Sequence, residues 1–299
     1  MEAMTAPLQW AMGGVFAALV TASATTSTLA RLRPGLELSE VRLRVRSWWV
    51  MAAVFVVALA SHRIVTIVFL ASVAVAALWE LAKMTKAVVP PVAFLAYLAG
   101  FGAAASGRSD FLVAVVPAAM AGTAVVLVAF DRPSGFMHRV GGTGVAAAVG
   151  VALAHLAALL TLPASAGSAG GAGLLLWLVI VAQAGDVAQF LAGRAWGRRS
   201  LAPAISPNKT VLGFVGGMVT AIGLGWGLGL LLTGHAWWWG GVLGAAVAVA
   251  GTLGDLLISA IKRDCGVKDA GSLIPGHGGV LDRVDSLILA APLVFWVVV

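Results

Sequence analysis

The chain has 299 residues, of which 61% are hydrophobic and 10% are charged, and its mean hydropathy is +1.01. Soluble domains carry about 25% charged residues, so this composition excludes a soluble globular protein and a disordered tail. A net charge of +7 would indicate nucleic-acid binding in a soluble protein, but here the positions of the charges matter more than their sum, and no nucleic-acid partner is expected. The single cysteine, Cys265, excludes an internal disulfide framework and a CxxC-type metal site.

Apolar runs follow one another along the whole chain, and a helix needs about 20 apolar residues to cross a bilayer. We therefore expect an all-α, polytopic integral membrane protein with about ten transmembrane helices. The expected spans are residues 8–30, 48–60, 64–82, 87–105, 111–130, 140–162, 172–193, 211–233, 237–261 and 286–299. Membrane-barrel strands are not expected, because runs such as Val145–Leu162 lack the alternation of polar and apolar residues that a barrel needs.

The basic residues predict the orientation of the chain. The loops after the first, third, fifth, seventh and ninth spans hold 17 of the 19 lysines and arginines, whereas the alternate loops hold only Arg63 and Arg108. Because basic loops stay in the cytoplasm, both termini are expected outside. The segment Arg31–Arg46 is interpreted as a positive-inside anchor, as an interfacial helix that attracts anionic lipid headgroups, or as both.

Charged residues concentrate between Asp255 and Asp285. This stretch contains five of the twelve acids and four basic residues, and its centre is rich in glycine. Mg²⁺ prefers a few carboxylate oxygens and the phosphates of a substrate, and backbone N–H groups exposed by glycine can bind anions. The stretch therefore indicates a metal-assisted phosphate site near the cytoplasmic surface. The alternative is an ordinary charged loop with internal ion pairs.

Helical spacing would bring several of these side chains together. If the ninth span continues as a helix, one of its faces carries Asp255, Ser259, Lys262 and Arg263. An ionisable residue near the end of a span is a functional-site hypothesis by default. Asp282 lies three residues before Asp285, so both can point the same way at the start of the last helix.

Polar residues also interrupt the other spans. In the seventh span, Asp186 is a candidate site residue, and the alternatives are a helix–helix hydrogen bond or an ion pair with Arg194. His155 is expected to pack between helices. Glu80 is expected to pair with Lys83 at the interface, with a lipid-headgroup contact as the alternative.

One long motif resembles a known family. Residues 259–285 read SAIKRDCGVKDAGSLIPGHGGVLDRVD. This run resembles the phosphatidate cytidylyltransferase (CDP-diacylglycerol synthase) signature, S-x-x-K-R-x4-K-D-x-G-x3-P-G-H-G-G-x2-D-R-x-D, with every fixed position present. Upstream, Ser206-Pro-Asn-Lys209-Thr210 resembles the S-P-x-K-T element of the family. Asp186 matches the first position of its D-x-x-A-Y element, although Gln189 and Phe190 replace the alanine and the tyrosine.

The resemblance implies a reaction of CTP with phosphatidic acid to give CDP-diacylglycerol and pyrophosphate. A phosphate monoester has a second pKa of about 6, so it is already anionic at neutral pH and needs no strong general base. The difficulty is to bring two anions together, which requires positioning and charge neutralisation. The implied domains are an extra N-terminal helix with a basic segment (1–47), N-terminal transmembrane helices (48–171) and a catalytic transmembrane region (172–299).

The resemblance also implies roles for individual residues. Mg²⁺, as one or two cations, would be held by Asp255, Asp282 and Asp285. The implied catalytic residues are Lys262, Arg263, Lys268, Asp269, His277 and Arg283. The implied substrate-binding residues are Ser206, Lys209, Thr210, Ser259, Gly276, Gly278, Gly279 and Asp186. For His277 the alternative is a turn histidine bonded to backbone.

The expected partners are CTP, phosphatidic acid and the bilayer, with a homodimer as one expected assembly. The expected location is the bacterial inner membrane, with the site facing the cytoplasm. Two alternatives remain: a related cytidylyltransferase acting on another lipid phosphate, and a membrane transporter. A CDP-alcohol phosphotransferase is disfavoured because its D-G-x2-A-R element is absent.

Overall fold

The structure is a computed structural model, and it describes residues 5–32, 39–85, 98–99, 101–103, 106–107, 136–163, 169–276 and 278–299. Within these residues the chain is overwhelmingly helical, which confirms the expected all-α membrane architecture. Of the expected spans, 111–130 lies outside the described residues, and so does most of 87–105.

The first helices of the described chain are α1 (Ala6–Leu32), α2 (Ser39–Ala60), α3 (Arg63–Thr85) and α6 (Phe136–Leu159). They are followed by α7 (Gly170–Trp196), α8 (Val211–Leu232), α9 (Trp237–Asp264) and α10 (Leu281–Val298). Six of them, α1, α2, α3, α7, α8 and α9, are long and apolar enough to cross a membrane. The apolar part of α6 is shorter, at Gly144–Leu159.

Two expected boundaries were wrong, and one element was missed. Helix α2 begins nine residues before the expected start at 48, so Arg42, Arg44 and Arg46 lie on this helix. Helix α10 begins at Leu281 rather than 286, which places both C-terminal aspartates within it. A small antiparallel hairpin, β1 (Ser200–Ala202) and β2 (Ser206–Thr210), joins α7 to α8.

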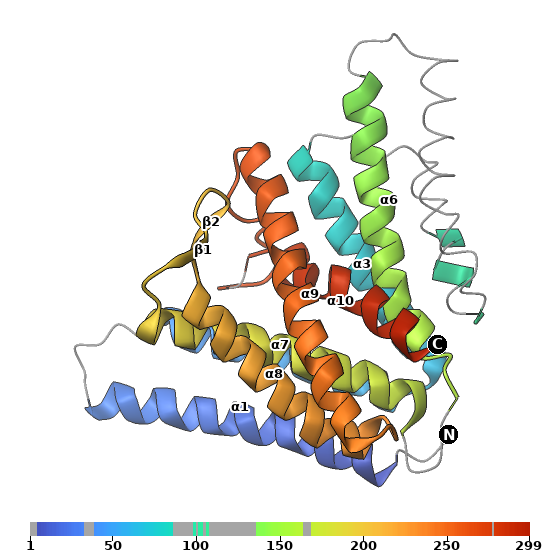
Figure 1. Cartoon of the computed structure of the whole chain (residues 1–299), viewed down its shortest axis with the longest axis vertical. Helices are drawn as coiled ribbons and strands as arrows, with labels where there is room; N and C mark the ends of the chain where they lie inside the picture. Colours follow the sequence, from blue (N-terminus) through green and yellow to red (C-terminus); the bar gives the residue numbers. More distant parts are fainter. Residues whose placement is uncertain are drawn as a thin grey trace.

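Helices α7, α8 and α9 pack side by side (Figure 1), and glycines allow α8 and α9 to approach closely. A Cβ atom at Gly244 would overlap the carbonyl oxygen of Ala221, and one at Gly240 would overlap that of Gly225. Trp177 of α7 donates its indole N–H to the same Gly225 oxygen at 3.0 Å. In a membrane, such small-residue contacts hold helices together because lipid supplies no hydrophobic driving force.

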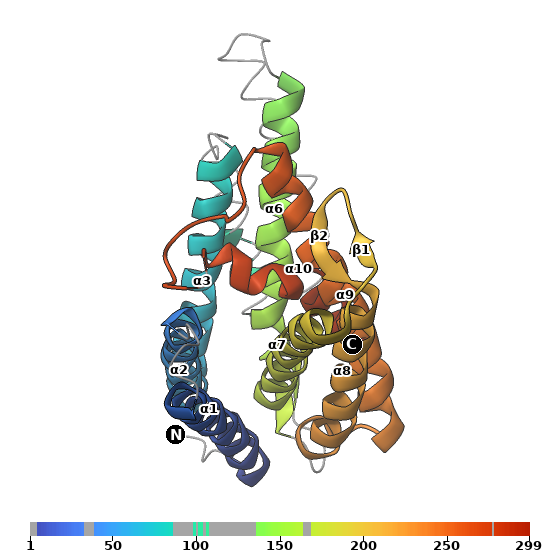
Figure 2. The ribbon, with the colours of Figure 1, turned by 90° about the vertical axis from the view of Figure 1, so that its left-hand side faces the viewer.

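Helix α10 lies among α9, α6, α7 and α3 (Figure 2), and its apolar face is buried. The His155 ring of α6 bonds to the Val151 carbonyl oxygen at 2.8 Å, and its Nε2 accepts the indole N–H of Trp296 at 3.1 Å. His155 is therefore the packing residue that its sequence context predicts.

Candidate functional site

The candidate site lies where the C-terminal end of α9, the β1–β2 hairpin and the start of α10 meet. A loop of residues 265–280, the signature loop, connects α9 to α10 and crosses beside α3 (Figure 2). Ser47 of α2 donates its hydroxyl to the Pro275 carbonyl oxygen at 2.7 Å. Segments that the basic-residue pattern assigns to one side of the membrane are thus in direct contact.

Helix α9 presents the first part of the site. The Ser259 hydroxyl donates to Oδ1 of Asp255 at 3.2 Å, as their spacing of four residues predicts. The other oxygen of Asp255, Oδ2, forms an ion pair with Lys209 of β2. The hairpin therefore delivers Lys209 from a segment distant in sequence onto the face of α9.

The strand β2 leads directly into α8. Thr210 ends the strand, and its hydroxyl accepts the backbone N–H of Gly213 at 3.1 Å, so it is the N-cap of α8. Ser206 begins the same strand opposite Ala202. The S-P-x-K-T element thus fixes a short strand and a helix start, with Lys209 between them.

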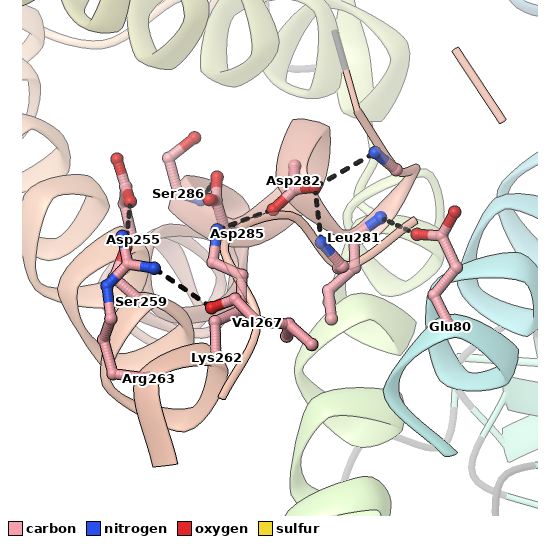
Figure 3. Close-up of polar contacts among 12 residues, drawn as sticks. Glu80, Asp255, Ser259, Lys262, Arg263, Val267, Leu281, Asp282, Asp285 and Ser286 are labelled. Atoms are coloured by element: carbon pink, nitrogen blue, oxygen red, sulfur yellow. Dashed lines mark hydrogen bonds and ion pairs between the residues drawn. The ribbon is translucent and has the colours of Figure 1, made fainter. Parts of the chain in front are cut away.

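Asp282 is the most fully bonded carboxylate of the site (Figure 3). Its Oδ1 accepts Lys262 Nζ at 2.6 Å, and its Oδ2 accepts the backbone N–H groups of Ala270 at 2.9 Å and Gly279 at 3.0 Å. Lys262 and Asp282 are only 8% and 9% exposed. The pair therefore joins the end of α9, the signature loop and the start of α10.

Three further carboxylates lie within electrostatic reach of one another: Asp186 of α7, Asp255 of α9 and Asp285 of α10. Asp285 is buried, and its Oδ1 accepts the backbone N–H of Ser286 at 2.8 Å. Lys209, Lys262 and Arg283 supply the neighbouring positive charge. The carboxylates repel one another, so binding of a cation between them would be favourable.

The metal prediction can be compared with this arrangement. In the part of the chain that the structure describes, no group of three or more acidic, histidine or cysteine side chains is placed to hold a metal ion. Mg²⁺ does not need one, because it usually takes one or two protein carboxylates and completes its shell with water and substrate phosphates. The donor chemistry of Asp255 and Asp285 fits that requirement.

The signature loop carries the remaining predicted residues. Lys268 and Asp269 are exposed to solvent. Gly276 and Gly278 adopt φ of +75° and +78°, a left-handed conformation that glycine tolerates best. His277 lies outside the described residues, so its predicted role stays a prediction.

Arg263 connects two segments of the site. Its Nε donates to the Ile205 carbonyl oxygen at 3.3 Å, and its Nη1 donates to the Val267 carbonyl oxygen at 3.0 Å. Arg263 therefore links the hairpin turn to the signature loop, a contact that its position in the sequence did not indicate. Arg283 on α10 has a buried Nε with no hydrogen-bond partner among the described residues.

The structure corrects the expectation for Glu80. Its side chain is not paired with Lys83 at the interface; it is 3% exposed and accepts the backbone N–H of Leu281 at 2.8 Å. Lys83 Nζ instead lies 5.5 Å from the centroid of the Trp79 ring. The signal was an acid inside an apolar span, but nothing in the sequence named its partner.

A small cavity of about 10 Å³ lies between α7, α8 and α9, and its lining includes Asp186, Gln189 and Thr252. The Thr252 hydroxyl donates to the Gln189 side-chain oxygen at 3.2 Å across this space. The cavity has room for about one water molecule and none for a nucleotide.

Comparisons with known proteins agree with the motif. The cytidylyltransferase family model matches residues 42–299. The uncharacterized protein YnbB of Escherichia coli strain K12 is 36% identical over 97% of this chain and 97% of its own length. Phosphatidate cytidylyltransferase of Haemophilus influenzae is 44% identical over 40% of this chain and 43% of its own, and that of Mycobacterium leprae is 40% identical over 48% and 44%.

The named enzymes are thus matched over less than half of their length, whereas YnbB is matched over 97% of this chain and the family model over residues 42–299. The match to the family model begins in α2, after the first helix. Together with the apolar helices, these similarities define an integral membrane nucleotidyltransferase. The chain belongs to the cytidylyltransferase family.

Proposed function

We propose that the protein transfers the cytidylyl group of CTP to phosphatidic acid, giving CDP-diacylglycerol and pyrophosphate. The observation that carries this proposal is the pair of ion pairs Lys209–Asp255 and Lys262–Asp282. Two further carboxylates, Asp186 and Asp285, lie within electrostatic reach of Asp255. Such a site can accept both a polyphosphate and a cation.

In the proposed reaction, a phosphate oxygen of phosphatidic acid attacks the α-phosphorus of CTP. The bond from that phosphorus to the bridging oxygen breaks, and pyrophosphate leaves with the electron pair. The attacking phosphate is already anionic, so the protein mainly has to hold two anions in line and offset their charge. Lys209 and Lys262 would turn from their aspartates toward the phosphates, with Lys268, Arg263 and Arg283 adding positive charge around them.

Mg²⁺ would be held by Asp255 and Asp285 and would neutralise charge on the phosphates. Asp282, the third predicted ligand, would reach the metal only by releasing Lys262, because all its hydrogen bonds in the structure are made within the protein. The lysines that leave the carboxylates would be the ones that bind phosphate.

An apolar groove supports a lipid as the acceptor. It measures about 360 Å³ and lies between α6, α9 and α10, where its lining includes Leu257, Ile261 and Ile288. Ile261 is adjacent to Lys262, and Ile288 lies one turn after Asp285. An acyl chain in this groove would lie between α9 and α10, the two helices that carry Asp255 and Asp285.

The proposed orientation follows from the basic loops: the site faces the cytoplasm of a bacterial inner membrane, where CTP is present. Contact between the segments at 47, 80, 205 and 263–281 supports placing them on one side of the membrane. The homodimer stays a prediction. The transporter alternative is set aside by membership of a nucleotidyltransferase family.

The test uses purified full-length protein in detergent with Mg²⁺, labelled CTP and a series of lipid phosphates. Phosphatidic acid should yield labelled CDP-lipid and pyrophosphate. Because Gln189 and Phe190 depart from the family element, a second candidate is the same transfer to another lipid phosphate, which the series would reveal as a different preferred acceptor. Absence of CDP-lipid with every acceptor would refute the proposal.

A further inference from the structure

We propose that Glu80 is a positioning residue that holds the start of α10, and with it Asp282 and Asp285, in the arrangement needed for turnover. Glu80 belongs to α3 and lies outside the family motif. The effect on turnover rests on the proposed function, whereas the structural effect does not depend on it.

The first argument is the bond at the end of the helix. Glu80 Oε2 accepts the N–H of Leu281, the first residue of α10, at 2.8 Å (Figure 3). The first N–H groups of a helix have no partner within it, and the helix dipole favours a negative charge at this end. The side chain is 3% exposed, so water cannot easily replace it. The bond therefore fixes the start of α10 against α3.

The second argument is the shape of the loop around the carboxylate. A Cβ atom at Gly271 or at Gly279 would overlap the Glu80 carboxylate, and at each position the three nearest heavy atoms all belong to Glu80. Neither glycine has a positive φ. A side chain at either position would therefore displace the Glu80 carboxylate, whereas the backbone conformation does not itself demand glycine.

The third argument connects Glu80 to the site. Asp282 Oδ2 accepts the N–H groups of Ala270 and Gly279. The same two loop segments contact Glu80, because Ala270 precedes Gly271 and both Gly271 and Gly279 lie against the Glu80 carboxylate. Glu80 and Asp282 therefore hold the same two loop segments together. Loss of Glu80 would release the loop amides that orient Asp282, and Asp282 in turn fixes Lys262.

The first test compares Glu80→Ala with Glu80→Gln in the CTP assay, with kcat expressed per folded molecule. A hydrogen bond to a charged group is worth about 1.5–3 kcal/mol, so Glu80→Ala should lower kcat roughly ten- to a hundredfold. The KM for CTP should change much less. Glu80→Gln keeps an acceptor oxygen at the same reach and should recover most of the loss. Equal kcat for wild type and Glu80→Ala would overturn the proposal.

The second test needs no substrate. Hydrogen–deuterium exchange of residues 269–285 should be faster in Glu80→Ala than in wild type, and close to wild type in Glu80→Gln. Unchanged exchange in Glu80→Ala would overturn the proposed contact. If the wild type makes no CDP-lipid, the proposed function fails, and the exchange measurement still decides whether Glu80 holds the loop.

The third test is a double-mutant cycle. Gly271→Ala should impair the wild type but cost little more in a Glu80→Ala background, because the overlapping carboxylate is gone. The matched control is Gly278→Ala, where φ is +78° and a Cβ would lie 2.9 Å from Asp282 Oδ2. This control should impair both backgrounds by a similar factor. An equal cost of Gly271→Ala in both backgrounds would contradict the role of Glu80.

Discussion

The Asp282→Asn substitution tests how much the Lys262–Asp282 ion pair contributes to stability and how much it contributes to turnover. The carboxylate accepts three hydrogen bonds and is 9% exposed. The amide keeps one oxygen, which can accept the two loop N–H groups, but it turns an NH₂ group toward the Lys262 ammonium. Removing one partner of a buried ion pair costs about 3–5 kcal/mol. At about 2–4 °C per kcal/mol for proteins of 150–250 residues, the melting temperature should fall by roughly 6–20 °C.

The assay combines thermal unfolding in detergent, followed by tryptophan fluorescence, with CTP turnover. A matched variant, Asp282→Asn with Lys262→Met, removes both charges. Replacing a buried pair by uncharged groups is often close to neutral for stability, so the double variant should regain most of the lost melting temperature. It should not regain turnover, because two groups proposed to bind phosphate and metal are missing. A single variant as stable as wild type, or an active double variant, would refute this reasoning.

Two further substitutions test the framework. Gly244→Val should lower the melting temperature by several degrees, because overpacking costs about 1–3 kcal/mol and the new side chain would overlap the carbonyl oxygen of Ala221. The control is Gly227→Ala, where a Cβ atom would have nothing within 4 Å, and it should leave the melting temperature nearly unchanged. Equal effects of the two substitutions would contradict the close packing of α8 and α9. Arg263→Lys should lower kcat/KM for CTP several-fold at an unchanged melting temperature, since one ammonium cannot bond the carbonyl oxygens of both Ile205 and Val267. Full activity of this variant would show that turnover does not need the bridge between the hairpin and the signature loop.

The sequence predicts the described helices well because a membrane imposes a simple rule on composition. About 20 apolar residues are needed to cross it, and charge is costly within it. The wrong helix starts and the missed hairpin occur in polar segments, to which that rule does not apply. Arginines extend α2 beyond the apolar run, and aspartates begin α10 before the next one. The β1–β2 hairpin, with strands of three and five residues, is too short for any periodicity.

In the candidate site, too, some contacts could be predicted from the sequence and others could not. The motif and the helical spacing of four residues predict the Ser259–Asp255 contact, which the structure confirms. The choice of partners between elements could not be predicted, because any lysine expected on the same side of the membrane could neutralise any of the aspartates. The structure shows Lys209 on Asp255 and Lys262 on Asp282. The prediction for Glu80 was wrong because its partner is a backbone N–H, a group that every residue except proline has and that no sequence pattern singles out.

The bond between Glu80 and Leu281 joins residues 201 positions apart, and this has a consequence for biosynthesis. At about 5–20 residues per second, the ribosome adds Leu281 roughly 10–40 s after Glu80. During that interval the glutamate has no helix start to bind. The newly made protein can therefore form this contact only after the start of α10 has been synthesised.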